Sequence, residues 1–232
     1  MVCKVNGINL YYEKHGKGKS LILLHGNGET HKIFDKAVPL LAEHFTVYAI
    51  DSRGHGQSDP VTEYRYTDMA DDIKCFIEAK GLNKPILYGF SDGGIIGLLL
   101  ACNYPQLLSQ IIISGANTEL TGIRNGWLKL FQIINAIVKE PKMDMMLKSP
   151  GITMDMLHKI TIPTTVLAGS RDMIKKDHTE YIANNIRNSN LHILQGEGHG
   201  SYVVHNTKLV KLILEATSEQ KSYEEQPRKA RI

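Results

Sequence analysis

Short apolar runs alternate with longer amphipathic segments along most of the chain. The runs have the length of strands and no alternation of polar and apolar positions, which is typical of strands buried on both faces of a parallel sheet. The predicted strands are residues 21–24, 46–50, 86–88, 111–113, 165–168 and 191–194. The predicted helices are residues 31–43, 67–80, 92–103, 176–187 and 202–216. This alternation predicts an α/β fold with a doubly wound, mostly parallel sheet.

Turn signals refine the pattern near the N-terminus. The strand-like segments 2–5 and 8–12 flank Asn6-Gly7, a pair that favours the two-residue turn of an antiparallel hairpin. Pro39 is expected to kink or restart the helix predicted for residues 31–43, because proline lacks the N–H that a helix interior requires. We therefore expect an N-terminal hairpin beside the parallel sheet.

Residues 118–160 break the alternation, because they lie between two predicted strands and have only helical character. A connection of this length is unusual in a compact domain, and long connections often form lids over functional sites. The insertion contains Trp127, Phe131 and several methionines, Met145 among them. These residues predict a short lid with an apolar, adaptable pocket, although they also fit core packing.

The length of 232 residues fits one α/β domain, predicted over 1–217, and the polar segment 218–232 is expected to be a flexible tail. The formal net charge is only +3 and the basic residues are scattered, which argues against a nucleic-acid partner. No run reaches the ~18 to 20 apolar residues that cross a bilayer, and no signal-peptide pattern is seen, so no membrane partner is expected. Three cysteines without metal-like spacing predict a cytoplasmic protein with no metal site. The sequence carries no signal for an oligomeric state.

The sequence Gly89-Phe90-Ser91-Asp92-Gly93 fits G-x-S-x-G and lies between a predicted strand and a predicted helix. The motif requires that context, because a tight strand-to-helix turn exposes the serine oxygen and the glycines leave room for the turn. The first N–H groups of the following helix point toward any oxyanion formed there. Ser91 is therefore the predicted nucleophile, and the alternative is a glycine-rich turn whose serine has no catalytic role.

A serine hydroxyl needs a positioned base, and the chain has ten histidines. His199 lies in a glycine-rich loop after the last predicted strand, at the edge where the active groups of a parallel sheet gather. His192 lies inside a predicted strand and His205 inside a predicted helix, so both fit the role less well. We predict that His199 is the base, and the alternative is a histidine of a surface loop.

The base in turn needs an acid that fixes its tautomer and stabilises the imidazolium. Asp172 follows the predicted strand 165–168 and so lies at the same edge of the sheet. Asp177 is the main rival, but it falls inside the next predicted helix. Asp172 is the predicted acid, and the alternative is that it caps that helix.

The chain order of serine, acid and histidine on a doubly wound sheet resembles the α/β-hydrolase fold family. Three further segments are similar to motifs of that family. Residues 25–28 resemble its oxyanion loop, residues 51–58 its D-x-R-G-x-G-x-S loop, and residues 167–172 its acid segment. The resemblance extends over about residues 3–216, and the combination is more specific than any single motif.

The resemblance implies an oxyanion hole made of two backbone N–H groups, those of Asn27 and Asp92. Gly26 lies in the oxyanion loop, and Phe90 directly precedes the nucleophile. Both are predicted to line the substrate pocket together with Trp127, Phe131 and Met145 of the lid. The resemblance also gives His25 a structural rather than a catalytic role.

Asp92 departs from the family pattern, in which the residue after the nucleophile is commonly neutral. A carboxylate pointing into the oxyanion hole would oppose the negative charge that forms there. Asp92 is therefore expected to point away, toward the positive end of the helix. The alternative is that Asp92 recognises a cationic group of the substrate.

Together these residues predict a cofactor-free serine hydrolase that cleaves a small ester, or a related thioester, lactone or amide, through an acyl-enzyme intermediate. Carbon–carbon bond hydrolysis and perhydrolysis use the same three groups and stay open. The alternative outside catalysis is a ligand-binding protein on the same scaffold. The complete set of three groups argues against that alternative.

Overall fold

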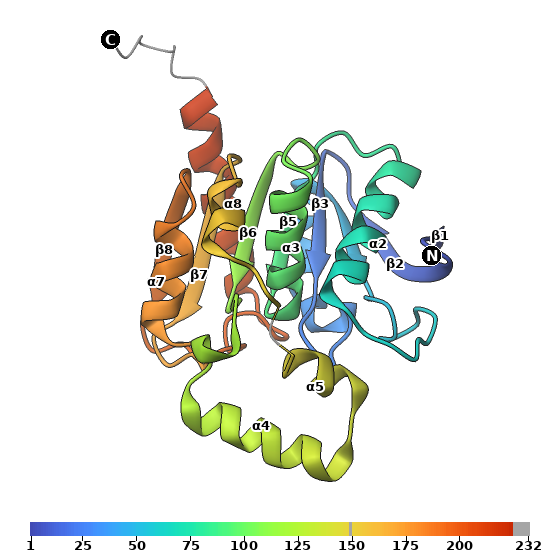
Figure 1. Cartoon of the computed structure of the whole chain (residues 1–232). Coiled ribbons are helices and arrows are strands. Elements are labelled where there is room, and N and C mark those ends of the chain that lie inside the picture. Colours follow the sequence, from blue (N-terminus) through green and yellow to red (C-terminus); the bar gives the residue numbers. More distant parts are fainter. Residues whose placement is uncertain (149, 225–232) are drawn as a thin grey trace.

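One sheet organises the part of the chain that the computed structural model describes, residues 1–148 and 150–224. Eight strands of this part pair in the order β1-β2-β4-β3-β5-β6-β7-β8 (Figure 1). β2 pairs antiparallel with β1 and with β4, and the other neighbours are parallel. The strands are β1 Val2–Val5, β2 Ile8–His15, β3 Lys19–Leu24, β4 Phe45–Ile50, β5 Ile86–Phe90, β6 Gln110–Ser114, β7 Thr164–Gly169 and β8 Ser189–Leu194. The predicted doubly wound, mostly parallel sheet is confirmed.

The N-terminal hairpin is confirmed as well. Val5 pairs with Ile8 across the turn, and the two turn residues Asn6 and Gly7 have φ of 44° and 79°. Positive φ at both turn residues gives a twist that matches the flanking strands, which is why Asn-Gly is favoured there.

Helices cover both faces of the sheet, and strand side chains alternate between the two cores. In β3, Ile22 and Leu24 belong to the hydrophobic core that includes residues of α2, α3 and α7, whereas Leu21 and Leu23 belong to the core that includes residues of α1 and α8. Figure 1 shows α2, α3 and α7 in front of the sheet and α8 behind it. These helices are α1 Val38–Leu41, α2 Tyr66–Ala79, α3 Asp92–Asn103, α7 Lys176–Asn184 and α8 Lys208–Glu224. Burial on both faces explains the continuous apolar runs of the sequence.

The helix predicted over residues 31–43 is instead two short helices, a 3-10 helix over His31–Phe34 and α1. The Thr30 hydroxyl accepts a hydrogen bond from the Lys32 N–H over 3.3 Å and so caps the first of them. Pro39 lies in the first turn of α1, where the missing N–H has no intrahelical partner to lose.

The last helix differs in both its limits from the range 202–216 predicted for it. The Asn206 side chain accepts a hydrogen bond from the Lys208 N–H over 2.9 Å, and α8 begins there. α8 continues to Glu224, so it includes the first part of the segment 218–232 that was expected to be a flexible tail. The rest of that segment, residues 225–232, lies outside the described residues.

The insertion, residues 118–160, contains a 3-10 helix Leu120–Gly122 and the helices α4 Asn125–Val138, α5 Pro141–Met146 and α6 Met154–His158. The helices α4 and α5 lie beyond the carboxyl ends of the parallel strands, whereas α6 lies beside α3 on one face of the sheet (Figure 1). The base of the insertion is joined to the loop after β7: Ile123 and Ile174 form an antiparallel bridge, and the Arg124 N–H donates to the Met173 carbonyl over 2.9 Å. The insertion is therefore held next to the loop that carries Asp172.

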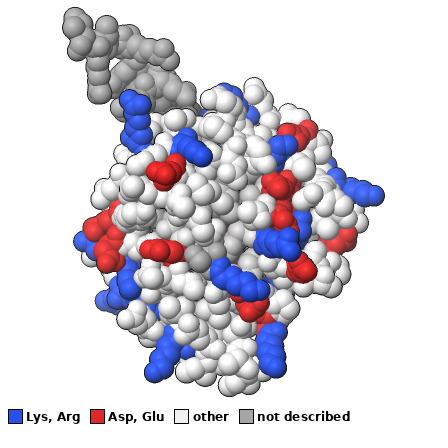
Figure 2. Space-filling view, viewed as in Figure 1, with Lys and Arg blue, Asp and Glu red and all other residues white. Residues whose placement is uncertain are grey.

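The outer surface of α4 is apolar. None of its residues is buried, and the exposed ones include Trp127, Leu130, Ile133, Ile137 and Val138. In the described part of the chain, no helix combines the length and apolarity needed to cross a membrane. Figure 2 shows Lys and Arg interspersed with Asp and Glu on the face seen in Figure 1.

Candidate active site

Ser91 occupies the sharp turn between β5 and α3. Its backbone has φ 52° and ψ −113°, a conformation that few non-glycine residues adopt and that is typical of strained functional turns. The glycines on either side permit this turn. A side chain at Gly89 would place its Cβ 2.1 Å from the Gly93 carbonyl oxygen, and one at Gly93 would lie 2.4 Å from that of Leu24. The G-x-S-x-G pattern is thus required by the close packing of strand, turn and helix.

The structure brings Ser91, His199 and Asp172 together, although they are far apart in the sequence. His199 Nε2 lies 3.1 Å from Ser91 Oγ, and His199 Nδ1 lies 2.7 Å from Asp172 Oδ1. Because a carboxylate only accepts, Nδ1 is the donor, which leaves Nε2 of the neutral ring to accept the proton of the serine hydroxyl. The arrangement has the geometry of a nucleophile, a base and an acid that orients the base.

The acid and the base are fixed by their own surroundings. Asp172 is almost fully buried, and its Oδ1 also accepts the Ile174 N–H over 2.9 Å. The His199 ring packs against the Phe90 ring, with centroids 4.9 Å apart. Gly115, directly after β6, leaves the space that this ring fills, because a Cβ there would lie 2.7 Å from His199 Cε1. Gly115 was not identified from the sequence, although a glycine at the carboxyl end of a buried strand could have indicated its role.

The rival residues lie elsewhere. His192 is part of β8, and His205 forms an exposed contact with Asp35 at 2.8 Å. Asp177 lies in the first turn of α7, where its carboxylate accepts the His178 N–H. None of these three lines the cavity in front of Ser91.

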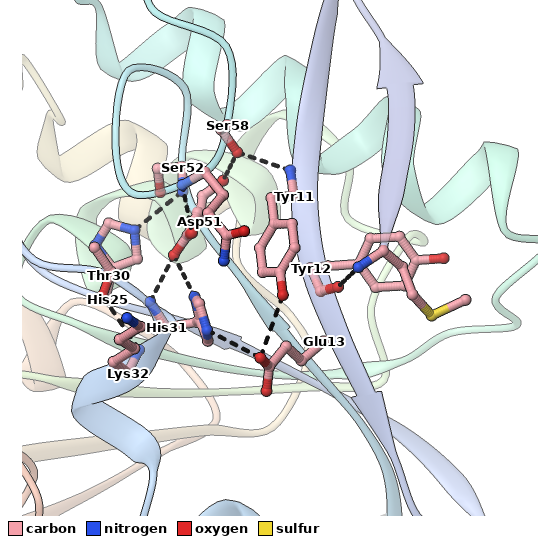
Figure 3. Close-up of polar contacts among 12 residues, drawn as sticks. Tyr11, Tyr12, Glu13, His25, Thr30, His31, Lys32, Asp51, Ser52 and Ser58 are labelled. Carbon is pink, nitrogen blue, oxygen red and sulfur yellow. Dashed lines mark hydrogen bonds and ion pairs between the residues drawn. The ribbon is translucent and has the colours of Figure 1, made fainter.

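Two neutral histidines hold the loop 25–28 beside the nucleophile. His25 Nε2 accepts the Ser52 N–H over 3.0 Å (Figure 3), and His55 Nε2 accepts the Gly28 N–H over 3.2 Å. Their Nδ1 atoms contact backbone carbonyl oxygens and are therefore the donors. Burial lowers the pKa of His25 to about 4 and lowers that of His55 as well, so both rings stay neutral and can accept.

The loop 51–58 is organised around buried charges. The Asp51 carboxylate is fully buried and accepts the backbone N–H and ring Nδ1 of His31, each over 2.7 Å (Figure 3). Arg53 forms two hydrogen bonds of 2.6 Å with Asp72 of α2. Arg53 therefore ties the loop to α2 and does not line the cavity.

The two backbone N–H groups predicted for the oxyanion hole belong to two segments that meet at Ser91, the loop 25–28 and the start of α3. The Gly93 N–H donates to the His25 carbonyl over 3.1 Å, which joins the start of α3 to the oxyanion loop. A Cβ at Gly26 would lie 3.1 Å from that of Ser91, so the loop backbone touches the nucleophile. Among the described residues, the N–H groups of Asn27 and Asp92 have no hydrogen-bond acceptor, and both are available to a substrate oxygen.

The Asp92 side chain does not line the cavity. Its carboxylate is buried and accepts the Tyr66 hydroxyl over 2.8 Å and the Asn27 side-chain amide over 2.9 Å. Burial raises its pKa, and the two donors oppose that rise. Asp92 thus holds α2 and the oxyanion loop against α3, and Tyr66 is a further residue that the sequence analysis did not identify.

A cavity of about 410 Å³ opens in front of Ser91, with mostly apolar walls. Of the predicted pocket residues, Gly26, Phe90 and Phe131 line it, and Trp127 and Met145 do not. The lining is completed by Asn27, Glu29, Ser91, Met143, Met146, Met173, His199, Gly200 and Val204.

The two residues outside the cavity have clear reasons for their positions. Met145 is 4% exposed and packs in the core, because neighbours on α5 point about 100° apart and Met143 and Met146 share the other face. Trp127 lies one turn before Phe131 on the same face of α4, is 45% exposed and does not line the cavity. In residues 1–148 and 150–224 no cluster of His, Cys, Asp and Glu has the arrangement that holds a metal ion.

Known proteins share both the sequence pattern and the architecture. A model of the alpha/beta hydrolase fold matches residues 19–134. The human serine hydrolase BPHL is 27% identical, over 86% of this chain and 79% of its own, and the AB hydrolase superfamily protein YisY of Bacillus subtilis is 27% identical, over 89% and 94%. The structure of the meta-cleavage product hydrolase CumD of Pseudomonas fluorescens IP01 superimposes with a TM-score of 0.81 at 16% identity, covering 95% of this chain and 98% of its own.

Proposed function

The chain is an enzyme of the α/β-hydrolase fold family, and we propose that it is a serine hydrolase that cleaves a small ester or a related acyl substrate. The observation that carries the proposal is the alignment of Ser91 Oγ, the His199 ring and Asp172, with contacts of 3.1 and 2.7 Å. In this proposal Ser91 is the nucleophile, His199 the base and Asp172 the acid that orients the base.

Acylation begins when Ser91 Oγ attacks the substrate carbonyl while His199 Nε2 takes the hydroxyl proton. The bond from oxygen to the carbonyl carbon forms, and the electron pair of the carbonyl moves onto its oxygen. The N–H groups of Asn27 and Asp92 donate to this oxyanion. A donor of this kind lowers the barrier by about 3 to 4 kcal/mol. Collapse of the intermediate expels the leaving group, which takes the proton from His199.

Deacylation repeats the sequence with water. His199 accepts a proton from the water, the resulting hydroxyl attacks the acyl carbonyl, and the same two N–H groups stabilise the second oxyanion. Expulsion of Ser91 Oγ, which recovers its proton from His199, releases the carboxylic acid. No step in this sequence needs a cofactor.

The walls of the cavity support a small, mainly apolar substrate. Its volume of about 410 Å³ is at the lower end of the range for small-molecule sites, and Phe90, Phe131 and the methionines Met143, Met146 and Met173 supply apolar surface. Methionine side chains adapt to different shapes, so we expect tolerance of several acyl groups within the same size. The insertion that carries Phe131 and two of these methionines is proposed to act as the lid of the site. The three cysteines, Cys3, Cys75 and Cys102, are free thiols in the described part of the chain, which supports a cytoplasmic location.

A fluorophosphonate probe and a panel of 4-nitrophenyl esters of increasing acyl length test the proposal. We expect the probe to label wild-type protein at Ser91, and Ser91→Ala to abolish labelling and lower ester turnover by several orders of magnitude. Lys4→Ala, a variant at an exposed position on β1, is the control and should keep wild-type labelling and turnover. Labelling and turnover that persist in folded Ser91→Ala would refute the assignment of Ser91. A folded wild type that neither reacts with the probe nor cleaves any of these esters would favour a binding protein on this scaffold.

A further inference from the structure

One acidic side chain stands in the otherwise apolar wall of the cavity. Among the described residues that line it, Glu29 is the only one with a carboxylate, and none is Lys or Arg. Glu29 Oε2 accepts the Gly26 N–H over 2.9 Å, which fixes the carboxylate beside the oxyanion loop. The side chain is partly buried, so it is in contact with the cavity as well as with the loop.

No cation of the described part of the chain neutralises this carboxylate by an ion pair. Lys142 lies close to the loop, since its carbonyl oxygen accepts from the Asn27 side chain, but its ammonium group contacts Glu140 and the Tyr64 ring. Asp92 and Asp172 add two further carboxylates around the site. The Asp92 carboxylate accepts hydrogen bonds from Tyr66 and Asn27. The Asp172 carboxylate accepts hydrogen bonds from His199 and Ile174.

From this arrangement we propose that Glu29 is a specificity-determining residue, which makes the enzyme prefer substrates that carry a positive charge near the scissile carbonyl over neutral ones of the same shape. The inference rests on the proposed function of Ser91 and names its substrate class. An ammonium group is attracted by a carboxylate that has no cation of its own, and the apolar walls limit screening by water. Phe90 and Phe131, which also line the cavity, are aromatic residues of the kind that attract cations.

The same charge acts against anionic substrates. A substrate carboxylate would have to enter a cavity that contains the Glu29 carboxylate and has no lining Lys or Arg. Two like charges within one cavity repel each other more strongly when water is partly excluded. The preferred order is therefore cationic, then neutral, then anionic. Asp92 is not part of this selection, because its carboxylate is buried and bonded on both oxygens.

Isosteric ester pairs measure the effect of the charge alone. The 4-nitrophenyl esters of 4-(trimethylammonio)butanoic acid and 5,5-dimethylhexanoic acid differ only by nitrogen or carbon at one atom of the acyl chain. The butanoates of choline and of 3,3-dimethylbutanol place the same difference in the leaving group. For at least one pair we expect the ratio of kcat/KM, cationic to neutral, to exceed one in wild type and to fall about tenfold in Glu29→Gln.

Glu29→Gln keeps an oxygen that can accept the Gly26 N–H, so the variant removes the charge rather than the hydrogen bond. Glu140→Gln is the matched control, because it removes one negative charge from the insertion at a position that does not line the cavity. An unchanged ratio in Glu29→Gln, or an equal fall in Glu140→Gln, overturns the proposal. If wild type hydrolyses no member of either pair, the proposed function fails and the inference with it. Hydrolysis of all four esters without charge preference overturns only the role of Glu29.

A second measurement needs no variant at Glu29. Burial raises the pKa of its carboxyl, which Asp92 also raises, while the Gly26 hydrogen bond and the charges of His199 and His205 lower it. Protonation removes the charge, so the wild-type ratio should fall as the pH falls. A loss of activity that affects both esters alike cancels in the ratio. A ratio that rises as the pH falls contradicts the proposal.

Discussion

Gly115 and the His199 ring occupy complementary space: a Cβ on Gly115 would lie 2.7 Å from His199 Cε1 and 2.8 Å from Nδ1. Gly115 also has φ of 60°, which is unfavourable for any residue with a side chain. The last residue of the strand before it, Ser114, accepts the Ser91 N–H with its carbonyl oxygen over 2.7 Å. One strand end thus positions both the proposed nucleophile and the proposed base.

Gly115→Ala is therefore expected to displace the His199 ring from Ser91. A misplacement of about 1 Å costs about 100-fold in turnover, and we expect kcat to fall by at least that factor. Gly126→Ala is the control, because a Cβ there meets nothing within 4 Å. The measurement is ester turnover beside thermal unfolding of both variants. Near-wild-type kcat in Gly115→Ala would show that the ring does not need this space.

Asp172→Asn is expected to lower kcat about 10⁴-fold with little change in the fold, because an amide at this position favours the wrong tautomer of His199. Asp177→Asn, on the neighbouring helix, is the control and should retain turnover. The measurement is steady-state kinetics, with circular dichroism to show that both variants are folded. Comparable losses in the two variants would remove the distinction between Asp172 and its rival.

Stability is expected to fall with pH because of His25. Burial depresses the pKa of this histidine to about 4, against 6.5 as its ordinary value, so between these values the unfolded chain binds the proton that the folded chain excludes. The stabilising contribution is complete above about pH 6.5 and is lost as the pH falls toward about 4, with a magnitude on the order of 3 kcal/mol.

Urea unfolding at a series of pH values checks this expectation. The free energy of unfolding should rise with pH across this window in wild type, and less steeply in His25→Gln. His44→Gln, at an exposed position before β4, is the control and should retain the wild-type slope. Identical slopes in all three proteins would mean that His25 titrates normally in the folded state.

Asp72→Asn is expected to destabilise the fold by about 3 kcal/mol, because it leaves the largely buried Arg53 guanidinium with only the partly exposed carboxylate of Asp68, 3.5 Å away. Glu63→Gln breaks an ion pair of the same 2.6 Å length with Arg65, but both partners are exposed and the loss should stay below about 1 kcal/mol. Chemical unfolding of the two variants makes the comparison, and equal losses would contradict it.

The features that were predictable from sequence are those fixed by local chemistry. Asn6-Gly7 has the two positive φ values that its turn requires, and the buried strands read as apolar runs because helices cover both of their faces. The order of Ser91, Asp172 and His199 was readable because the carboxyl ends of parallel strands meet at one edge.

The lining of the cavity was not predictable in the same way, because it depends on how the insertion is oriented. Met143, Met145 and Met146 are equivalent as sequence, yet the orientation of α5 places only the first and last of them in the cavity. The role of Glu29 was not predictable from sequence either. It follows from the hydrogen bond between its side chain and the Gly26 N–H, and this contact lies within a loop that has no periodic pattern.

Trp127 is the only tryptophan of the chain, is 45% exposed, and lies on α4 next to Phe131, whose ring centroid is 5.9 Å away. Because Phe131 lines the cavity, selective excitation of this single indole gives an emission signal from the roof of the site with no contribution from tryptophan elsewhere. A ligand that moves α4 will shift the wavelength of that emission, so binding to the site can be followed in unlabelled protein.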